Sequence, residues 1–113
     1  MLLGKPQDWW LSPLLTTLAD QHLFWGALTL TALVDNAALT FMGTTVADLT
    51  LSAKCSLVAG AVAGGGLTVI ANAPNPVGAG LLQSAFGKTG ISPARLFLAA
   101  LPYTGLAALA FLI

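Results

Sequence analysis

Polar side chains interrupt an otherwise apolar sequence at two places where they could carry chemistry. Asp35 and Asn36 lie inside an apolar run from Leu23 to Val46, and a second interruption, GGGLTVIANAPNP, follows at residues 64–76. A carboxylate in hydrocarbon costs about 3 kcal/mol or more, so it is kept mainly where it binds something. Two polar breaks within lipophilic segments are typical of a transport site built from interrupted helices.

The composition predicts an all-α membrane protein. The 113 residues are 57% hydrophobic and 7% charged, with a mean hydropathy of +0.87. Soluble domains carry about 25% charged residues and leave roughly 40% of a small chain's surface in water. Most of the surroundings must therefore be lipid, where helices satisfy their own backbone polar groups. We expect an integral membrane protein.

The polar residues exclude several classes of function. Four Lys and Arg balance four Asp, so no basic patch for nucleic acid exists. Cys55 is the only cysteine, which rules out a disulfide within the chain, and one Cys with one His makes no zinc site. No nucleophile with a base and no phosphate-binding loop is present. We therefore expect no enzyme and no cofactor, apart from transported ions.

The first half of the chain predicts an interfacial segment followed by a polar pair at membrane depth. Residues 1–22 are expected to form an interfacial lead and a short amphipathic helix at 13–21, because Ser12–Pro13 is a typical helix start. Residues 23–47 fit either one helix of about 25 residues or a re-entrant hairpin with Asp35 at its tip. No Gly or Pro forces a turn there, so the local sequence favours the continuous helix.

The second half predicts a discontinuous helix over 51–86 and a terminal transmembrane helix over 92–113. Gly64–Gly66 lower helix propensity, and two prolines follow that disfavour helix in the residues before them. We expect extended backbone at Ala73 and Asn75 and a restart at Asn75 that runs to about residue 86. The terminal helix is about 31 Å long, enough to cross a membrane. The whole chain, 1–113, is predicted to be one membrane unit.

Unwound backbone in a membrane exposes carbonyl oxygens, which suit a cation such as Na⁺. Thr68, Asn72 and Asn75 add side-chain oxygens, and Asp35 adds one charge. A site that binds either a proton or Na⁺ is the minimal device for ion-coupled antiport. Simpler interpretations stay open: Asp35 as a helix cap or pairing residue, Gly64–Gly66 as packing positions, and the asparagines as part of an ordinary loop.

Two motifs resemble those of a known superfamily. LVDNAA at 33–38 resembles the Asp-Asn tip motif of the ion-transporter superfamily, which includes bacterial sodium/proton antiporters, arsenite permeases and divalent anion/sodium symporters. GGGLTVIANAPN at 64–75 is similar to the Gly-Gly…Pro-Asn stretch of their discontinuous helix. The match is best with a family of Na⁺/H⁺ antiporters, over about residues 20–113.

The resemblance implies the hairpin geometry for 23–47, with both motifs facing an ion site at mid-membrane. It assigns ion binding to five residues: Asp35, Asn36, Thr68, Asn72 and Asn75. Superfamily members have two inverted halves, each with one hairpin and one broken helix, whereas this chain has one of each. We therefore expect the C-terminal segment of an ion-coupled transporter of the bacterial inner membrane, a sodium/proton antiporter, contributing half of the ion site. Its expected partners are lipids and either the remaining half or other copies of itself.

Two other functions stay open. A small proteolipid of a rotary machine also carries one buried carboxylate, but its glycine-rich helix precedes the acidic one. A non-transporting membrane subunit would need none of the five residues for ion flux.

Overall fold

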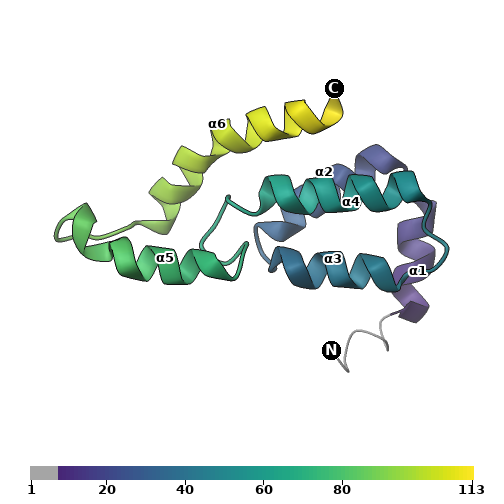
Figure 1. The fold of residues 1–113 in the computed structure, drawn as a ribbon, viewed down its shortest axis with the longest axis horizontal. Helices are drawn as coiled ribbons and strands as arrows, with labels where there is room; N and C mark the ends of the chain where they lie inside the picture. The colour runs from purple at the N-terminus through teal and green to yellow at the C-terminus, as the bar shows by residue number, and fades with distance from the viewer. Residues whose placement is uncertain (1–7) are drawn as a thin grey trace.

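The computed structural model describes residues 8–113, and the part of the interfacial lead predicted at residues 1–7 lies outside them. The described residues form helices without a strand (Figure 1). In chain order these are α1 (Asp8–Thr17), α2 (Asp20–Thr31), α3 (Asn36–Thr45), α4 (Leu51–Gly64), α5 (Pro74–Leu82), the 3₁₀ helix η2 (Gln83–Phe86) and α6 (Pro93–Leu112).

Helices α2 and α4 run side by side in the same direction, and glycines bring their backbones together. A Cβ atom at Gly64 would lie 2.5 Å from the carbonyl oxygen of Leu28, and one at Gly60 would overlap the carbonyl oxygen of Phe24. Small residues four apart allow this close approach in membrane helices. The α2–α4 pair therefore depends on the absence of side chains at Gly60 and Gly64.

Helix α3 packs on another side of α4 and runs in the opposite direction. Gly43 of α3 faces Leu57, whose Cδ atoms would lie 2.9 Å from an added Cβ. One apolar cluster joins the three helices through Ala27, Leu39, Leu57 and Ala61. Helix α4 is thus the central helix, with α2 and α3 packed against it.

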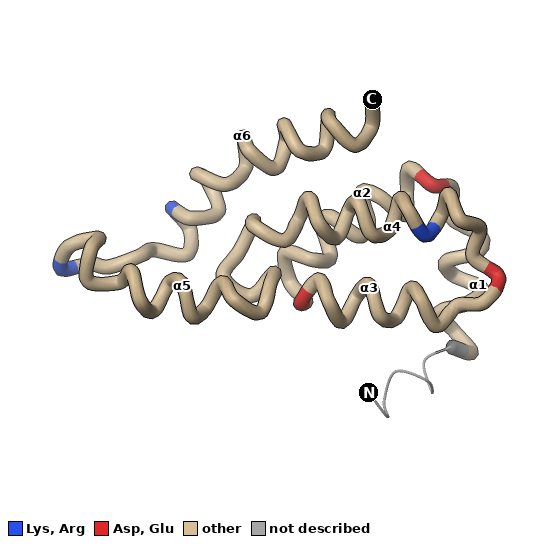
Figure 2. The backbone as a smooth tube through the Cα atoms, viewed as in Figure 1, with Lys and Arg blue, Asp and Glu red and all other residues tan. Residues whose placement is uncertain are grey.

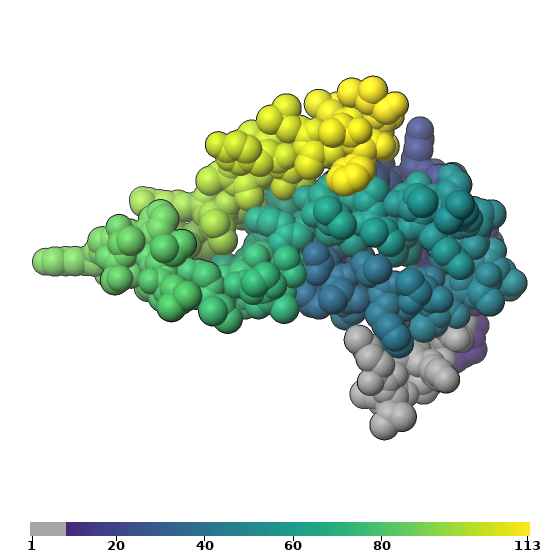
Figure 3. Space-filling model, in the orientation of Figure 1, coloured from purple at the N-terminus to yellow at the C-terminus, as the bar shows by residue number. Residues whose placement is uncertain are grey.

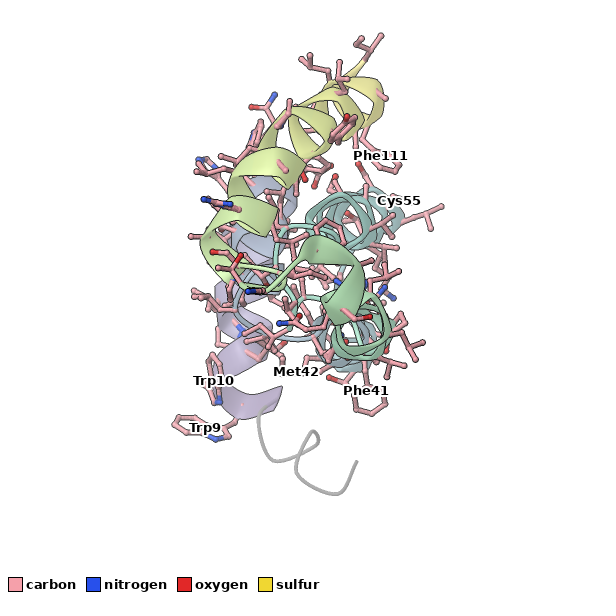
Figure 4. All side chains as sticks on the ribbon, turned by 90° about the vertical axis from the view of Figure 1, so that its left-hand side faces the viewer. Trp9, Trp10, Phe41, Met42, Cys55 and Phe111 are labelled. Carbon is pink, nitrogen blue, oxygen red and sulfur yellow. The ribbon has the colours of Figure 1, made fainter. Side chains whose placement is uncertain are left out.

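Two further clusters close the ends of this three-helix unit. One connects α1 and the α3–α4 turn with the N-terminal turns of α2 and α4: Leu11, Leu23, Val46, Leu49 and Ala53. The other brings α6 against α2 and α4: Phe24, Leu28, Ala63, Leu67 and Ala108. Figure 4 shows Trp9 and Trp10 projecting from α1 on one side of the molecule and Phe111 of α6 and Cys55 of α4, which line one pocket, on the opposite side.

The first two helices differ from the prediction. The helix expected at 13–21 starts earlier and ends at Thr17, with Pro13 inside it, and the next helix already starts at Asp20. Asp20 lies in the first turn of α2, where a negative charge is favourable, and its carboxylate accepts a hydrogen bond from the hydroxyl of Ser52. Asp20 therefore marks the start of a second helix, α2, where the prediction from Ser12–Pro13 had one helix continuing to residue 21.

The apolar run 23–47 is broken, so the locally favoured continuous helix is wrong. Helix α2 ends at Thr31, and α3 begins at Asn36 with Asp35 as its N-cap. The N–H of Ala38 donates to Asp35 Oδ2 at 3.3 Å, which satisfies one free donor of the new helix. Asp35 and Asn36 thus start a new helix after the end of α2, although neither Gly nor Pro lies between the two helices.

The segment 51–86 contains two helical parts, and the second part starts differently from the prediction. Residues 65–73 separate α4 from α5. Ala73 has helical angles (φ −51°, ψ −40°) and not the extended ones expected before a proline, and α5 starts at Pro74 instead of Asn75. The side-chain amide of Asn75 donates hydrogen bonds to the carbonyl oxygens of Gly65 and Thr68, and these bonds hold this turn against the local preference.

Helix α6 is, within the described residues, the one helix long and apolar enough to span a membrane, with a mean hydropathy of 1.6. Most of its surface is exposed. The molecule is elongated and flat, with extents of 50 × 36 × 16 Å. Helix α5 and its turn into α6 form the projecting end of the molecule, and α6 then returns along one edge (Figure 3).

Candidate functional site

Two hydrogen bonds join the α2–α3 connection to the unwound segment between α4 and α5. The backbone N–H of Asn36 donates to the carbonyl oxygen of Ala71 at 3.0 Å. The hydroxyl of Thr68 donates to the carbonyl oxygen of Ala32 at 2.7 Å. The two polar interruptions of the sequence, separated by about one helix-turn-helix of chain, therefore meet in the middle of the molecule (Figure 1).

Asp35 brings the one carboxylate to this meeting point. Its Oδ2 caps α3, whereas its Oδ1 is buried and has no hydrogen-bond partner. In Figure 2 an acidic position at the start of α3 lies in the middle of the molecule, and the other coloured charges of the described residues lie toward its two ends. Buried polar atoms are normally hydrogen-bonded, so Oδ1 is an acceptor left open within the described residues.

Asn36 lies against the start of the unwound segment. An added Cβ at Gly65 would be only 3.0 Å from Asn36 Nδ2. Glycine at position 65 therefore leaves room for this amide beside the end of α4.

Asn75 holds the unwound segment closed. Its Nδ2 donates to the carbonyl oxygens of Gly65 and Thr68, both at 2.9 Å, and its N–H donates to the carbonyl oxygen of Asn72 at 3.0 Å. The amide thus replaces helical hydrogen bonds that residues 65–73 do not make. This structural role of the Asn75 nitrogen adds to the ligand role expected for its oxygen.

Asn72 and several carbonyl groups remain open to a ligand. Within residues 8–113 no hydrogen bond reaches the side chain of the half-buried Asn72. The same holds for four carbonyl oxygens of the unwound segment, those of Gly66, Leu67, Val69 and Ile70. An unwound segment with free carbonyls next to a carboxylate is an arrangement suited to a small cation.

Thr31 was not among the residues singled out from the sequence. Its side chain is fully buried, and among the described residues Thr31 Oγ1 and Asp35 Oδ1 are the two buried side-chain oxygens without a partner. The apolar spacing of Phe24, Ala27 and Leu28 continues to Thr31 at helical period. This spacing, which places a hydroxyl in a buried stripe, is the signal that identifies it.

A groove of about 560 Å³ between α5 and α6 reaches the same region. Gly66 and Asn75 line its inner part, and Arg95 of α6 also borders it. Apolar residues make up most of its remaining lining. The unwound segment is therefore accessible from one side of the described unit.

The fold and this arrangement define an all-helical protein in which the tip of a helical pair is hydrogen-bonded to a broken helix. Comparison with known families gives the particular group: a family described as "Putative Na+/H+ antiporter" matches residues 1–113, and the chain belongs to it. The family is one of membrane transporters and not of enzymes, so the protein is a membrane protein with a transport-related role. No curated protein and no solved structure matches the chain.

Proposed function

We propose that the chain is the C-terminal segment of a sodium/proton antiporter of the bacterial inner membrane and supplies half of its ion site. The five residues of that half-site are Asp35, Asn36, Thr68, Asn72 and Asn75. One observation carries the proposal: Asp35 Oδ1 is buried without a partner where the hydrogen bond from Asn36 to Ala71 joins the α2–α3 tip to the break.

The chemistry of exchange follows from a single carboxylate. Asp35 binds either Na⁺ or a proton, and occupation by one excludes the other, which couples the two fluxes. The free carbonyls of Gly66, Leu67, Val69 and Ile70 and the amide of Asn72 supply neutral oxygens that replace the water of the ion. Asn75 and Thr68 keep these oxygens in place through their hydrogen bonds.

The charges support a placement in the bilayer. A long axis of 50 Å slightly exceeds a bilayer of about 40–45 Å including headgroups. With this axis across the membrane, the charged positions near both ends meet the headgroups and the α3 N-terminus lies near the centre (Figure 2). Helices α2 and α3 then form a re-entrant hairpin, and α4 with α5 forms one interrupted crossing.

The second half of the site comes from another hairpin and broken helix. Transporters of this construction pair two such units with inverted orientation. We propose that the partner unit belongs to the same transporter or to another copy of this chain. The exposed apolar surface of α6 faces lipid in this arrangement.

Proton flux in reconstituted vesicles tests the proposal. The full-length transporter is placed in liposomes with an internal pH dye, and Na⁺ is added outside. The wild-type protein is expected to show Na⁺-dependent proton flux, and Asp35→Asn is expected to lose it at least 100-fold. Asn is also a good N-cap, so Asp35→Asn keeps α3 intact.

Asp48→Asn is the matched control, because Asp48 is exposed in the α3–α4 connection. It is expected to retain wild-type flux. Wild-type flux in Asp35→Asn would instead favour a non-transporting membrane subunit.

A further inference from the structure

Two buried oxygens without partners flank the tip of the α2–α3 pair. Thr31 Oγ1 is on the last residue of α2, and Asp35 Oδ1 is on the N-cap of α3, with residues 32–34 between them. We infer that Thr31 is a further ligand of the transported cation, its hydroxyl oxygen binding the same ion as the Asp35 carboxylate. This inference rests on the function proposed above.

Most helical threonines of the described residues bond their hydroxyl within the helix; Thr40 and Thr104 do not, but Thr31 is the one whose unpaired hydroxyl oxygen is fully buried. A helical threonine normally donates to a carbonyl one turn earlier. Thr29, on the same helix, donates to Trp25 at 2.9 Å, and Thr44 donates to Phe41 at 2.7 Å. Thr31 makes no such bond and is 0% exposed, so neither the helix nor water satisfies it.

The position of Thr31 on α2 places this residue near the unwound segment between α4 and α5. Phe24, Ala27 and Leu28 form the buried face of α2, which contacts Gly60 and Gly64 of α4. Thr31 extends this face one turn beyond Ala27, to the level at which α4 ends. The carbonyl of the next residue, Ala32, accepts the hydrogen bond from Thr68 of the unwound segment.

A ligand explains why a hydroxyl occupies this position. A buried hydroxyl without a partner destabilises a fold relative to an apolar group of the same shape, such as valine. A cation bound by both oxygens would supply the partner that each of them lacks in the described residues. Carboxylate, hydroxyl and carbonyl oxygens are suitable ligands for a hard cation.

Two substitutions test the role of the hydroxyl in the full-length transporter. Thr31→Val removes it and keeps the shape, and Thr31→Ser keeps it. The measurements are the Na⁺ KM of antiport and the rise in melting temperature on adding Na⁺, with choline as the inert cation. Thr31→Val is expected to raise KM about tenfold or more and to lose the Na⁺-induced rise. Thr31→Ser is expected to retain both within about threefold.

The control is Thr29→Val, whose hydroxyl is exposed and already bonded within α2. It should leave KM and the Na⁺-induced rise unchanged. In choline, Thr31→Val should melt at or above the wild-type temperature, because it removes an unpaired polar atom. A lower melting temperature in choline would show a purely structural hydroxyl and overturn the inference.

The two proposals fail in distinguishable ways. If wild-type protein responds to Na⁺ and Thr31→Val responds equally, Thr31 is not a ligand, while the antiport function stands. If wild-type protein shows neither flux nor a Na⁺-induced rise, the proposed function fails, and this inference fails with it.

Discussion

The backbone N–H of Asn36 donates to the carbonyl oxygen of Ala71 at 3.0 Å, so the first turn of α3 is tied directly to the unwound segment that precedes α5. The hydroxyl of Thr68 makes the second tie, to Ala32 on the other side of the tip. The α2–α3 connection thus donates one hydrogen bond to the unwound segment and accepts another from it. Movement of the α2–α3 tip must therefore be accompanied by movement of the break.

Removing the Thr68 hydroxyl should loosen this connection. Thr68→Val leaves the carbonyl of Ala32 without its donor, at an expected loss of about 1–2 kcal/mol in unfolding free energy. Thr68→Ser retains the donor and should lose less than half as much. Chemical denaturation of the purified protein in detergent measures both. Equal losses for Val and Ser would contradict a role for this hydrogen bond.

The close approach of α2 and α4 predicts a strong effect of small side chains. Gly60→Ala would place a methyl group against the carbonyl of Phe24, and Gly64→Ala would place one 2.5 Å from that of Leu28. Each should cost about 1–3 kcal/mol in unfolding free energy, because backbone atoms must move apart. Thermal unfolding in detergent measures the loss.

Gly26→Ala is the control for these glycine substitutions. Gly26 lies in α2, and nothing lies within 4 Å of an added Cβ. Alanine there should be neutral or stabilise by about 0.5–1 kcal/mol through its better helix propensity. A loss as large as that of Gly60→Ala would mean that α2 tolerates no side chain on either face, contrary to the packing described.

Substitutions of the two asparagines of the unwound segment should have different effects: that of Asn75 on stability, and that of Asn72 on Na⁺ binding. Asn75→Ala removes both bonds to the carbonyls of Gly65 and Thr68 and should cost about 2 kcal/mol in unfolding free energy. Asn72→Ala removes a side chain without hydrogen bonds in the described residues and should leave stability within about 0.5 kcal/mol. Its expected effect is a higher Na⁺ KM for antiport. The account is wrong on this point if Asn72→Ala unfolds the protein and Asn75→Ala does not.

Much of the helical architecture follows from local sequence. Thr50 caps α4 by accepting a hydrogen bond from the N–H of Ala53, the three glycines predict the end of α4, and Pro93 stands at the start of α6, where proline is favoured. Each of these signals lies within about one helical turn of the helix end that it determines. They can therefore be recognised in the sequence without knowledge of the fold.

The remaining features depend on contacts between distant residues. The break at Asp35 is accompanied by the hydrogen bond from Asn36 to Ala71, and the helical angles of Ala73 by the side-chain bonds of Asn75. No local pattern contains these partners, so local preference gave the wrong result at both places. The apolar spacing of α2 places Thr31 in a buried stripe, but only the packing of α2 on α4 shows that its hydroxyl has no partner.

Equilibrium binding of radioactive Na⁺ to the purified full-length transporter tests the central claim most directly. The wild-type protein is expected to bind Na⁺ saturably, with protons competing and K⁺ competing poorly. Asp35→Asn should lose this binding while keeping its melting temperature in choline, and Asp48→Asn should bind as the wild type does. Saturable, proton-sensitive binding that survives in Asp35→Asn would contradict the assignment of the ion site to the meeting point of the tip and the break.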